Sequence, residues 1–353
     1  MNYPIYITHE LIMETSKCYS SRKFKNYEQD FEKVNSIERT ALGKFVIVKG
    51  IVHLYGYKIA GEGPYSGFFD VINQQFYFKD KIKDKNQPIF HIFKNIENEF
   101  PKSIQTFYKY VHKGYFPSIN DEMLARSFSY KPRNKSEKIK TISKDNIIKK
   151  GRRMVDFEEY IKNNPYSNIV EMDTVIGKFE DKKCIMTLYF RKSKLMLMFL
   201  IKKYKPSEVK KVFKNIRNSI GDNLYKQMFE VILTDNGWEF SKPEDIEFNF
   251  ETGEKLINVF YTEPYSSWQK GGIERNHEFI RYIIPKGITF DELNKKNIAD
   301  MMNNINNVQR KSLDYQTPYL IFQKEYGEKI SNKLHLKYIP KDEVNLSYKI
   351  LNK

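Results

Sequence analysis

The chain has 353 residues, 40% of them hydrophobic and 15% aromatic, which is enough for two or three folded domains. Its 60 basic and 44 acidic residues give a net charge of +16, which favours nucleic acid or an anionic membrane surface as a partner. No apolar run reaches transmembrane length, and residues 1–10 lack a signal-peptide pattern, so we expect no membrane association and a cytoplasmic location. Cys18 and Cys184 are far apart in the sequence, which excludes a disulfide framework and fits a reducing compartment.

Residues 1–84 show short extended segments and no recognisable chemistry. The apolar run within 44–57 predicts a strand interrupted at Gly50, and residues 79–85 predict a solvated connector. We assign 1–84 to an N-terminal region of α+β character.

Residues 85–130 predict a helix-turn-helix-like DNA-binding region. Apolar residues recur at helical spacing over 89–96, and Ser103 is a suitable N-cap for a second helix that ends near Gly114. The outward face of the second helix would carry four candidate DNA contacts, namely Gln105, Thr106, Lys109 and Lys113. A plain helical hairpin is the alternative interpretation.

Residues 131–160 predict a basic linker. Ten basic and two acidic residues lie between 131 and 153, and this density favours contact with phosphates over a merely solubilising role. The candidate DNA contacts here are Lys131, Arg133, Lys149, Lys150, Arg152 and Arg153.

Residues 161–326 have an α/β pattern. Segments 168–176, 184–190 and 195–201 predict an antiparallel meander, and 231–234 predicts a further short strand. Helices are expected after a cap at Ser207, over the segment that carries Glu274, after a Thr289–Glu292 capping box, and at Thr317-Pro318. We therefore expect a mixed sheet flanked by helices, followed by a C-terminal tail over 327–353.

Three acids stand where strands end or a helix begins: Asp173, Asp235 and Glu274. Carboxylates without His or Cys partners favour Mg²⁺ or Mn²⁺ over zinc, and two such ions could activate a nucleophilic oxygen and stabilise a leaving oxygen. Lys270 and Arg275, on either side of Glu274, are further candidate DNA contacts. Gly271-Gly272 would allow the backbone to pass close to a bulky neighbouring group. The alternative interpretations are that Asp235 is an ordinary turn residue, that Asp173 is held in a salt bridge, and that Glu274 lies in an ordinary capped helix.

The three motifs resemble those of DDE transposases of the insertion-sequence thirty family. The motifs are VEMDTVIG at 170–177, LTDNGWEF at 233–240 and PYSSWQKGGIERNH at 264–277, and segments 106–114 and 311–318 resemble family sequence outside the core. The resemblance implies a ribonuclease-H-like integrase catalytic core with Asp173, Asp235 and Glu274 as the catalytic and metal-binding triad.

The resemblance also implies an activity and its partners. The activity is hydrolysis at transposon ends followed by strand transfer by the freed 3′-hydroxyl. The partners are double-stranded DNA, namely the inverted-repeat ends and the target. The protein is expected to act as a homo-oligomer on DNA in the bacterial nucleoid. The N-terminal helix-turn-helix usual in the family is not seen within 1–84, and Trp238 replaces a small polar residue. A catalytically idle DNA-binding remnant or repressor, or a general nuclease of the same fold, are the alternatives.

Overall fold

The computed structural model describes residues 80–95, 103–112, 119, 121–124, 149–249, 251–264 and 266–352, together with the backbone of strands at 37–39, 43–48 and 51–56. Predictions on other residues, including those for Lys113, Lys131 and Arg133, lie outside the described part of the chain. The chain divides into two compact units, Met1–Lys131 and Pro132–Lys353.

The first unit contains a three-stranded antiparallel sheet in the order β1-β2-β3. Its strands are β1 (Ile37–Arg39), β2 (Gly43–Val48) and β3 (Ile51–Gly56), with Val48 paired to Ile51. The interrupted strand predicted over 44–57 is therefore a pair of strands.

A small helical core follows in the same unit. It contains α3 (Ile89–Asn95), α4 (Ile104–His112), a π-helical turn η2 (Asp80–Asp84) and a 3₁₀ turn η3 (Asp121–Met123). Ser103 caps α4 as predicted, because its Oγ accepts from the backbone N–H of Thr106 at 3.2 Å. Ile82 is buried in the core that includes Phe107 and Val111, so the prediction of a solvated connector over 79–85 was wrong.

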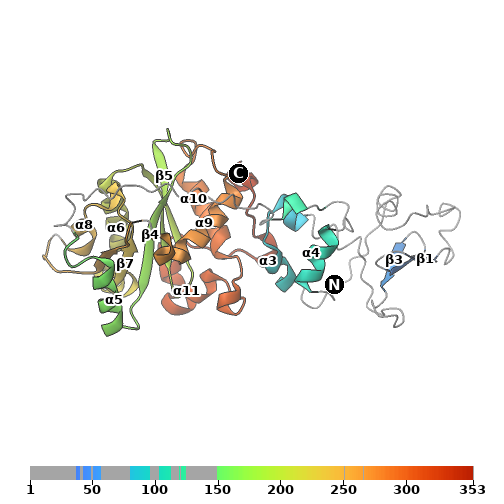
Figure 1. Cartoon of the computed structure of the whole chain (residues 1–353), viewed down its shortest axis with the longest axis horizontal. Coiled ribbons are helices and arrows are strands. Elements are labelled where there is room, and N and C mark those ends of the chain that lie inside the picture. Colours follow the sequence, from blue (N-terminus) through green and yellow to red (C-terminus); the bar gives the residue numbers. More distant parts are fainter. Residues whose placement is uncertain are drawn as a thin grey trace. The chain divides into compact units, whose positions relative to one another are not determined.

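The second unit is built on a five-stranded mixed sheet with the strand order β6-β5-β4-β7-β8 (Figure 1). The strands are β4 (Ile169–Val175), β5 (Lys183–Phe190), β6 (Met196–Lys202), β7 (Val231–Thr234) and β8 (Asn258–Tyr261). β4, β5 and β6 form the predicted antiparallel meander, whereas β7 and β8 run parallel to β4. This order, with these directions, is the ribonuclease-H-like sheet.

Helices cover both faces of the sheet (Figure 1). Neighbouring residues of a strand point to opposite faces, so Phe190 and Tyr189 of β5 mark the two sides. α6 (Pro206–Ile220) and α7 (Asp222–Met228) pack on the Phe190 side, where Phe190 lies 5.4 Å from Phe229 between ring centroids. α9 (Gly271–Ile283) packs against β4 and β5 on the Tyr189 side.

The outer edge of β6 is covered by α10 (Lys295–Asn306). The buried side chain of Asn306 accepts from the Met196 N–H at 2.9 Å and donates to the Met196 carbonyl at 2.8 Å. Its amide thus bonds β6 as a neighbouring strand would, and it satisfies backbone groups at the sheet edge.

The remaining helices complete the second unit. They are α5 (Met154–Asn163), α8 (Glu244–Glu247), α11 (Pro318–Tyr326) and α12 (Glu328–Lys333), with 3₁₀ turns η4 (Trp238–Phe240), η5 (Ser267–Lys270), η6 (Lys311–Leu313), η7 (Lys341–Glu343) and η8 (Tyr348–Asn352). Helix α5 begins inside the stretch predicted to be a linker. In the described part of the chain, no helix combines the length and apolar character needed to cross a membrane.

Two of the predicted helix starts were wrong. Lys205 is the N-cap of α6 and Pro206 its first residue, so Ser207 lies inside the helix. α10 begins after its N-cap Asn294, which forms a capping box with Asn297 in the first turn, whereas the Thr289 hydroxyl is engaged by Asp181 at 2.7 Å. The cap at Thr317 is confirmed, since its hydroxyl accepts from the Leu320 N–H.

Candidate active site

Asp173 and Asp235 lie near the same edge of the sheet on neighbouring parallel strands, Asp173 within β4, two residues before its end, and Asp235 directly after β7. Met172 of β4 pairs with Thr234 of β7, and each is followed directly by one of the two acids. The parallel register therefore places the two carboxylates next to each other. The carboxyl ends of strands are where open α/β sheets bind their ligands.

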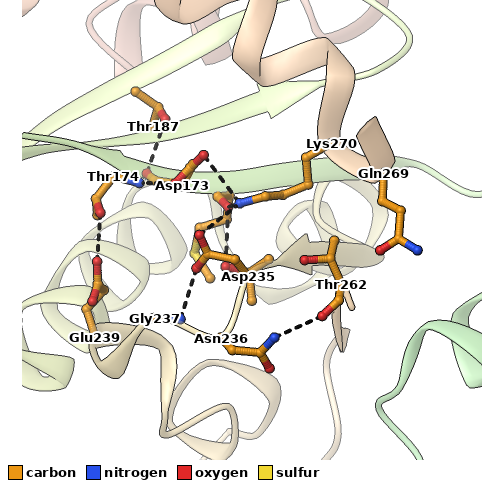
Figure 2. Close-up of polar contacts among 12 residues, drawn as sticks. Asp173, Thr174, Thr187, Asp235, Asn236, Gly237, Glu239, Thr262, Gln269 and Lys270 are labelled. Atoms are coloured by element: carbon orange, nitrogen blue, oxygen red, sulfur yellow. Dashed lines mark hydrogen bonds and ion pairs between the residues drawn. The ribbon is translucent and has the colours of Figure 1, made fainter. Parts of the chain in front are cut away.

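A lysine ammonium lies between the two carboxylates (Figure 2). Lys270 Nζ is 3.3 Å from Asp173 Oδ2 and 3.4 Å from Asp235 Oδ2. It also donates to the Met172 carbonyl at 3.2 Å. The Lys270 side chain is 5% exposed, against 19% for Asp173 and 44% for Asp235. A buried ammonium thus neutralises two partly exposed acids.

The second oxygen of each aspartate is held by a backbone amide. The Thr174 N–H donates to Asp173 Oδ1 at 2.8 Å, and the Gly237 N–H donates to Asp235 Oδ1 at 3.0 Å. These bonds fix both carboxyl groups so that their Oδ2 atoms face the same cation (Figure 2).

A third carboxylate, Glu171 of β4, anchors the start of α9. Glu171 lies on the same face of the strand as Asp173, and its buried Oε2 accepts from the Ile273 N–H at 2.6 Å. Its Oε1 accepts from Arg191 Nε at 2.7 Å, and Arg191 Nη2 donates to the Gln269 carbonyl at 2.8 Å. An acid at a helix N-terminus satisfies a free N–H and complements the helix dipole.

The close approach predicted for Gly271-Gly272 is confirmed at Gly272 alone. A Cβ at Gly272 would overlap the Tyr189 ring and lie 3.1 Å from Glu171 Oε2, whereas a Cβ at Gly271 would meet no atom within 4 Å. The absence of a side chain at Gly272 therefore lets α9 sit directly against β5.

Glu274 projects from the first turn of α9, four residues after Lys270, and its side chain is exposed. Within the described residues, no three His, Cys, Asp or Glu side chains lie close enough together to hold one metal ion. The structure therefore brings together two acids of the predicted triad, and the group nearest to both is Lys270.

The aspartate pair nevertheless fits a hard divalent cation. Both Oδ2 atoms already converge on one positive charge, and carboxylate oxygens are the ligands that Mg²⁺ and Mn²⁺ prefer.

A histidine of α9 is linked to the Asp173 backbone. His277 Nε2 lies 2.9 Å from Thr187 Oγ1, and the Thr187 hydroxyl donates to the Asp173 carbonyl at 3.1 Å. Because the hydroxyl donates to Asp173, His277 donates to the hydroxyl from Nε2. Burial, with the charges of Lys270 and Arg281 adding to it, lowers the pKa of His277 to about 3, so the ring is neutral.

The loop after β7 is tied to its surroundings by two further contacts. Asn236 Nδ2 donates to the Thr262 carbonyl at 2.9 Å, which links the loops that follow β7 and β8. The Thr174 hydroxyl donates to the buried Glu239 at 2.7 Å (Figure 2). Trp238 and Trp268 lie on these same two loops and are 69% and 73% exposed.

Some functional residues were missed by the sequence interpretation. The spacing of two between Glu171 and Asp173 could have placed both acids on one strand face. Nothing in the sequence links Arg191 or Thr187 to this site, because their contacts depend on how α9 packs. His277 lies in the third motif, 264–277, but the sequence gives no sign of its bond to Thr187.

The predicted DNA contacts have different environments. Lys270 is turned inward onto the aspartates, and Arg152 Nη2 bonds the buried Glu247 at 2.7 Å, so neither side chain is placed as a surface phosphate contact. Lys149 is half-buried with Nζ 5.8 Å from the centre of the Tyr261 ring. Five others, Gln105, Lys109, Lys150, Arg153 and Arg275, are exposed, and Thr106 is half-buried.

Sequence comparison identifies relatives among transposases. A protein named as integrase ORF3 of Spiroplasma virus SpV1-R8A2 B is 29% identical over 230 residues, which cover 64% of this chain and 65% of that protein. The transposase for insertion sequence element IS4351 of Bacteroides fragilis is 33% identical over 149 residues, 42% of each chain. Transposase InsI for element IS30C of Escherichia coli K12 is 26% identical over 140 residues, 40% of this chain and 34% of that protein.

This chain is a relative of the IS30-type transposases. The resemblance inferred from its three acidic motifs is thereby confirmed. The matches span less than two thirds of the length of each of these relatives. No protein-family profile matches the chain.

Among solved structures, the catalytic core domain of BIV integrase is similar over 45% of this chain and 95% of that domain, with 20% identity and a TM-score of 0.32.

Proposed function

We propose that this protein is a transposase that binds transposon ends and catalyses metal-dependent DNA strand cleavage and strand transfer. The observation that carries the proposal is the convergence of Asp173 Oδ2 and Asp235 Oδ2 on one cationic group at the carboxyl edge of the sheet. The similarity to IS30-type transposases supports the same function.

Asp173, Asp235 and Glu274 would hold two Mg²⁺ or Mn²⁺ ions, which would supply activation of the attacking oxygen and stabilisation of the leaving oxygen of a phosphodiester. The Thr174 and Gly237 amides keep the two aspartates oriented. Glu171 fixes the first turn of α9, from which Glu274 extends toward solvent. The chain's own contribution is thus a set of acids held in position before DNA arrives.

The DNA partner would be double-stranded, comprising the inverted-repeat ends and the target, and the protein would act as a homo-oligomer on it. Exposed cations of the second unit, Lys150, Arg153 and Arg275, would contact phosphates. In the first unit, Gln105, Thr106 and Lys109 on α4 would face the DNA, with Lys113, Lys131 and Arg133 as further contacts. The exposed Trp238 and Trp268, on the segments that follow β7 and β8, would offer flat surfaces for unpaired bases.

The test uses labelled duplexes that carry the inverted repeats flanking the gene, incubated with purified protein and Mg²⁺. Asp173→Asn, Asp235→Asn and Glu274→Gln should each reduce nicking at least about a hundredfold, because each removes a charged oxygen ligand. Glu292→Gln, at an exposed acid outside the site, is the matched control and should nick like the wild type.

Gel-shift binding should persist in all four variants. Wild-type nicking in any of the three acid variants would contradict the proposal. Binding without cleavage by the unaltered chain would favour a DNA-binding remnant or repressor, and cleavage of duplexes without repeats would favour a general nuclease.

A further inference from the structure

We propose that Lys270 is an internal counter-ion that occupies the cation position of Asp173 and Asp235 and is displaced when a divalent metal binds. The inference rests on the proposed function, because it assigns a control element to the same site. It predicts that metal binding exchanges one cation for another.

The contacts of Lys270 use the full bonding capacity of its side chain. An ammonium has three N–H donors, and Nζ has three oxygen partners, at 3.3 Å on Asp173, 3.4 Å on Asp235 and 3.2 Å on the Met172 carbonyl. The residue is 4% exposed, so the group is withdrawn from water and from any surface ligand. A lysine in this position stabilises two neighbouring carboxylates that would otherwise repel each other.

The same oxygens cannot serve both cations. A bound Mg²⁺ or Mn²⁺ would sit about 2 Å from a carboxylate oxygen, much closer than the ammonium does. Two positive groups in contact with the same pair of Oδ2 atoms would repel each other strongly in a partly buried site. Metal binding and the Lys270 ion pairs are therefore mutually exclusive.

The surrounding structure allows the side chain to move without the helix. Glu171 holds the Ile273 N–H, and Arg191 holds the Gln269 carbonyl, so the backbone on both sides of Lys270 is anchored. The flexible four-carbon stem of lysine can then turn outward. An ammonium released at this edge would become available to a DNA phosphate, the role that the sequence predicted for Lys270.

The experiment measures Mn²⁺ binding to the full chain by isothermal titration calorimetry, without DNA. Lys270→Met keeps much of the apolar stem and removes the charge, and Lys286→Met is the matched control at an exposed lysine after α9. Lys270→Met should bind Mn²⁺ about tenfold or more tighter than the wild type, because no resident cation has to leave. Lys286→Met should bind like the wild type.

Thermal unfolding gives a second readout that does not involve activity. Without metal, Lys270→Met should unfold at a lower temperature than the wild type, since two carboxylates lose their counter-ion. Added Mn²⁺ should raise its unfolding temperature by more than that of the wild type. Should Lys270→Met not fold, Lys270→Gln, which retains a donor for the Met172 carbonyl, is measured in its place with the same expectations.

Equal or weaker Mn²⁺ affinity in the Lys270 variant would overturn the inference while leaving a metal site, and the proposed function, in place. Asp235→Asn should abolish the binding heat in both backgrounds, which assigns that heat to this site. Absence of Mn²⁺ binding in the wild type and in every Lys270 variant would overturn the proposed function, and this inference with it.

Discussion

Gly272 fixes the distance between α9 and β5. Because a Cβ there would overlap the Tyr189 ring, Gly272→Ala should push α9 outward and lower the free energy of unfolding by about 1 to 3 kcal/mol. Urea denaturation measures this change, and nicking should fall as well, because Lys270 and Glu274 move with the helix.

Gly271→Ala is the adjacent control. A Cβ at Gly271 has open space, and alanine favours helix, so this variant should be as stable as the wild type or more stable by up to about 1 kcal/mol. Equal effects of the two substitutions would show that the Tyr189 contact does not set the position of the helix.

His277 makes the free energy of unfolding depend on pH. The folded protein holds its pKa near 3, whereas an unfolded histidine titrates near about 6.5, so the unfolded chain takes up a proton first as the pH falls. The contribution of the neutral ring is fully present above about pH 6.5 and is lost as the pH falls toward 3.

Between pH about 7.5 and about 5, the wild type should lose about 1 to 2 kcal/mol more stability than His277→Gln, which remains neutral and keeps a donor for Thr187. Urea denaturation at the two pH values measures the difference. The same pH dependence in both proteins would show that His277 is not the titrating group.

At the scale of elements, α10 protects the edge of the sheet through one side chain. Asn306→Ala removes both bonds to Met196 and leaves a buried N–H and carbonyl without partners, so the unfolding free energy should fall by about 2 to 4 kcal/mol. Hydrogen exchange of the Met196 amide should accelerate. Asn332→Ala, at an exposed asparagine of α12, should change neither quantity.

The strands of the second unit could be predicted because they are short, nearly continuous apolar runs bounded by polar turns, and the long helices because their apolar residues repeat at helical spacing. The starts of α6 and α10 could not be predicted. α6 begins at Pro206 without a side-chain cap, and the start of α10 depends on which hydroxyl or amide is free to cap. Thr289 has the right spacing for a cap but bonds Asp181, and Asn294 takes its place. The short helix α7, which follows Gly221 without a break, also carried no separate signal.

At the scale of the whole molecule, the net charge of +16 predicts salt-sensitive DNA binding. Replacing both Lys150 and Arg153 by Gln should reduce the slope of log affinity against log salt by up to about 1.8, since each phosphate contact contributes about 0.9. Arg152→Gln, in the same stretch, should leave that slope unchanged.

Arg152→Gln should instead lower stability by about 3 kcal/mol, because the buried Glu247 loses its guanidinium partner and keeps the Val259 N–H and the more distant Lys255 ammonium. Filter binding over a salt series and urea denaturation separate the two effects. A reduced slope for Arg152→Gln would show that its guanidinium reaches DNA despite the ion pair.

The aspartate pair was within reach of sequence analysis because parallel strands bring their carboxyl ends to one edge. The position of Lys270 was not, because its sequence neighbours, Gln269 and Arg275, suggest a surface-exposed basic segment. Lys270 faces the acids because Glu171 and Gly272 hold the start of α9 close against β4 and β5. The candidate site therefore depends on packing at positions that carry no catalytic signature.

Trp238 and Trp268 are the two tryptophans of the 353-residue chain, and both are exposed, on the segments that carry Asp235 and Lys270. Ultraviolet excitation at the red edge of protein absorption, where tyrosine no longer contributes, consequently reports on these two segments alone. Quenching, wavelength shifts and anisotropy of that native emission can follow the arrival of an ion or an oligonucleotide in real time, without attaching a dye.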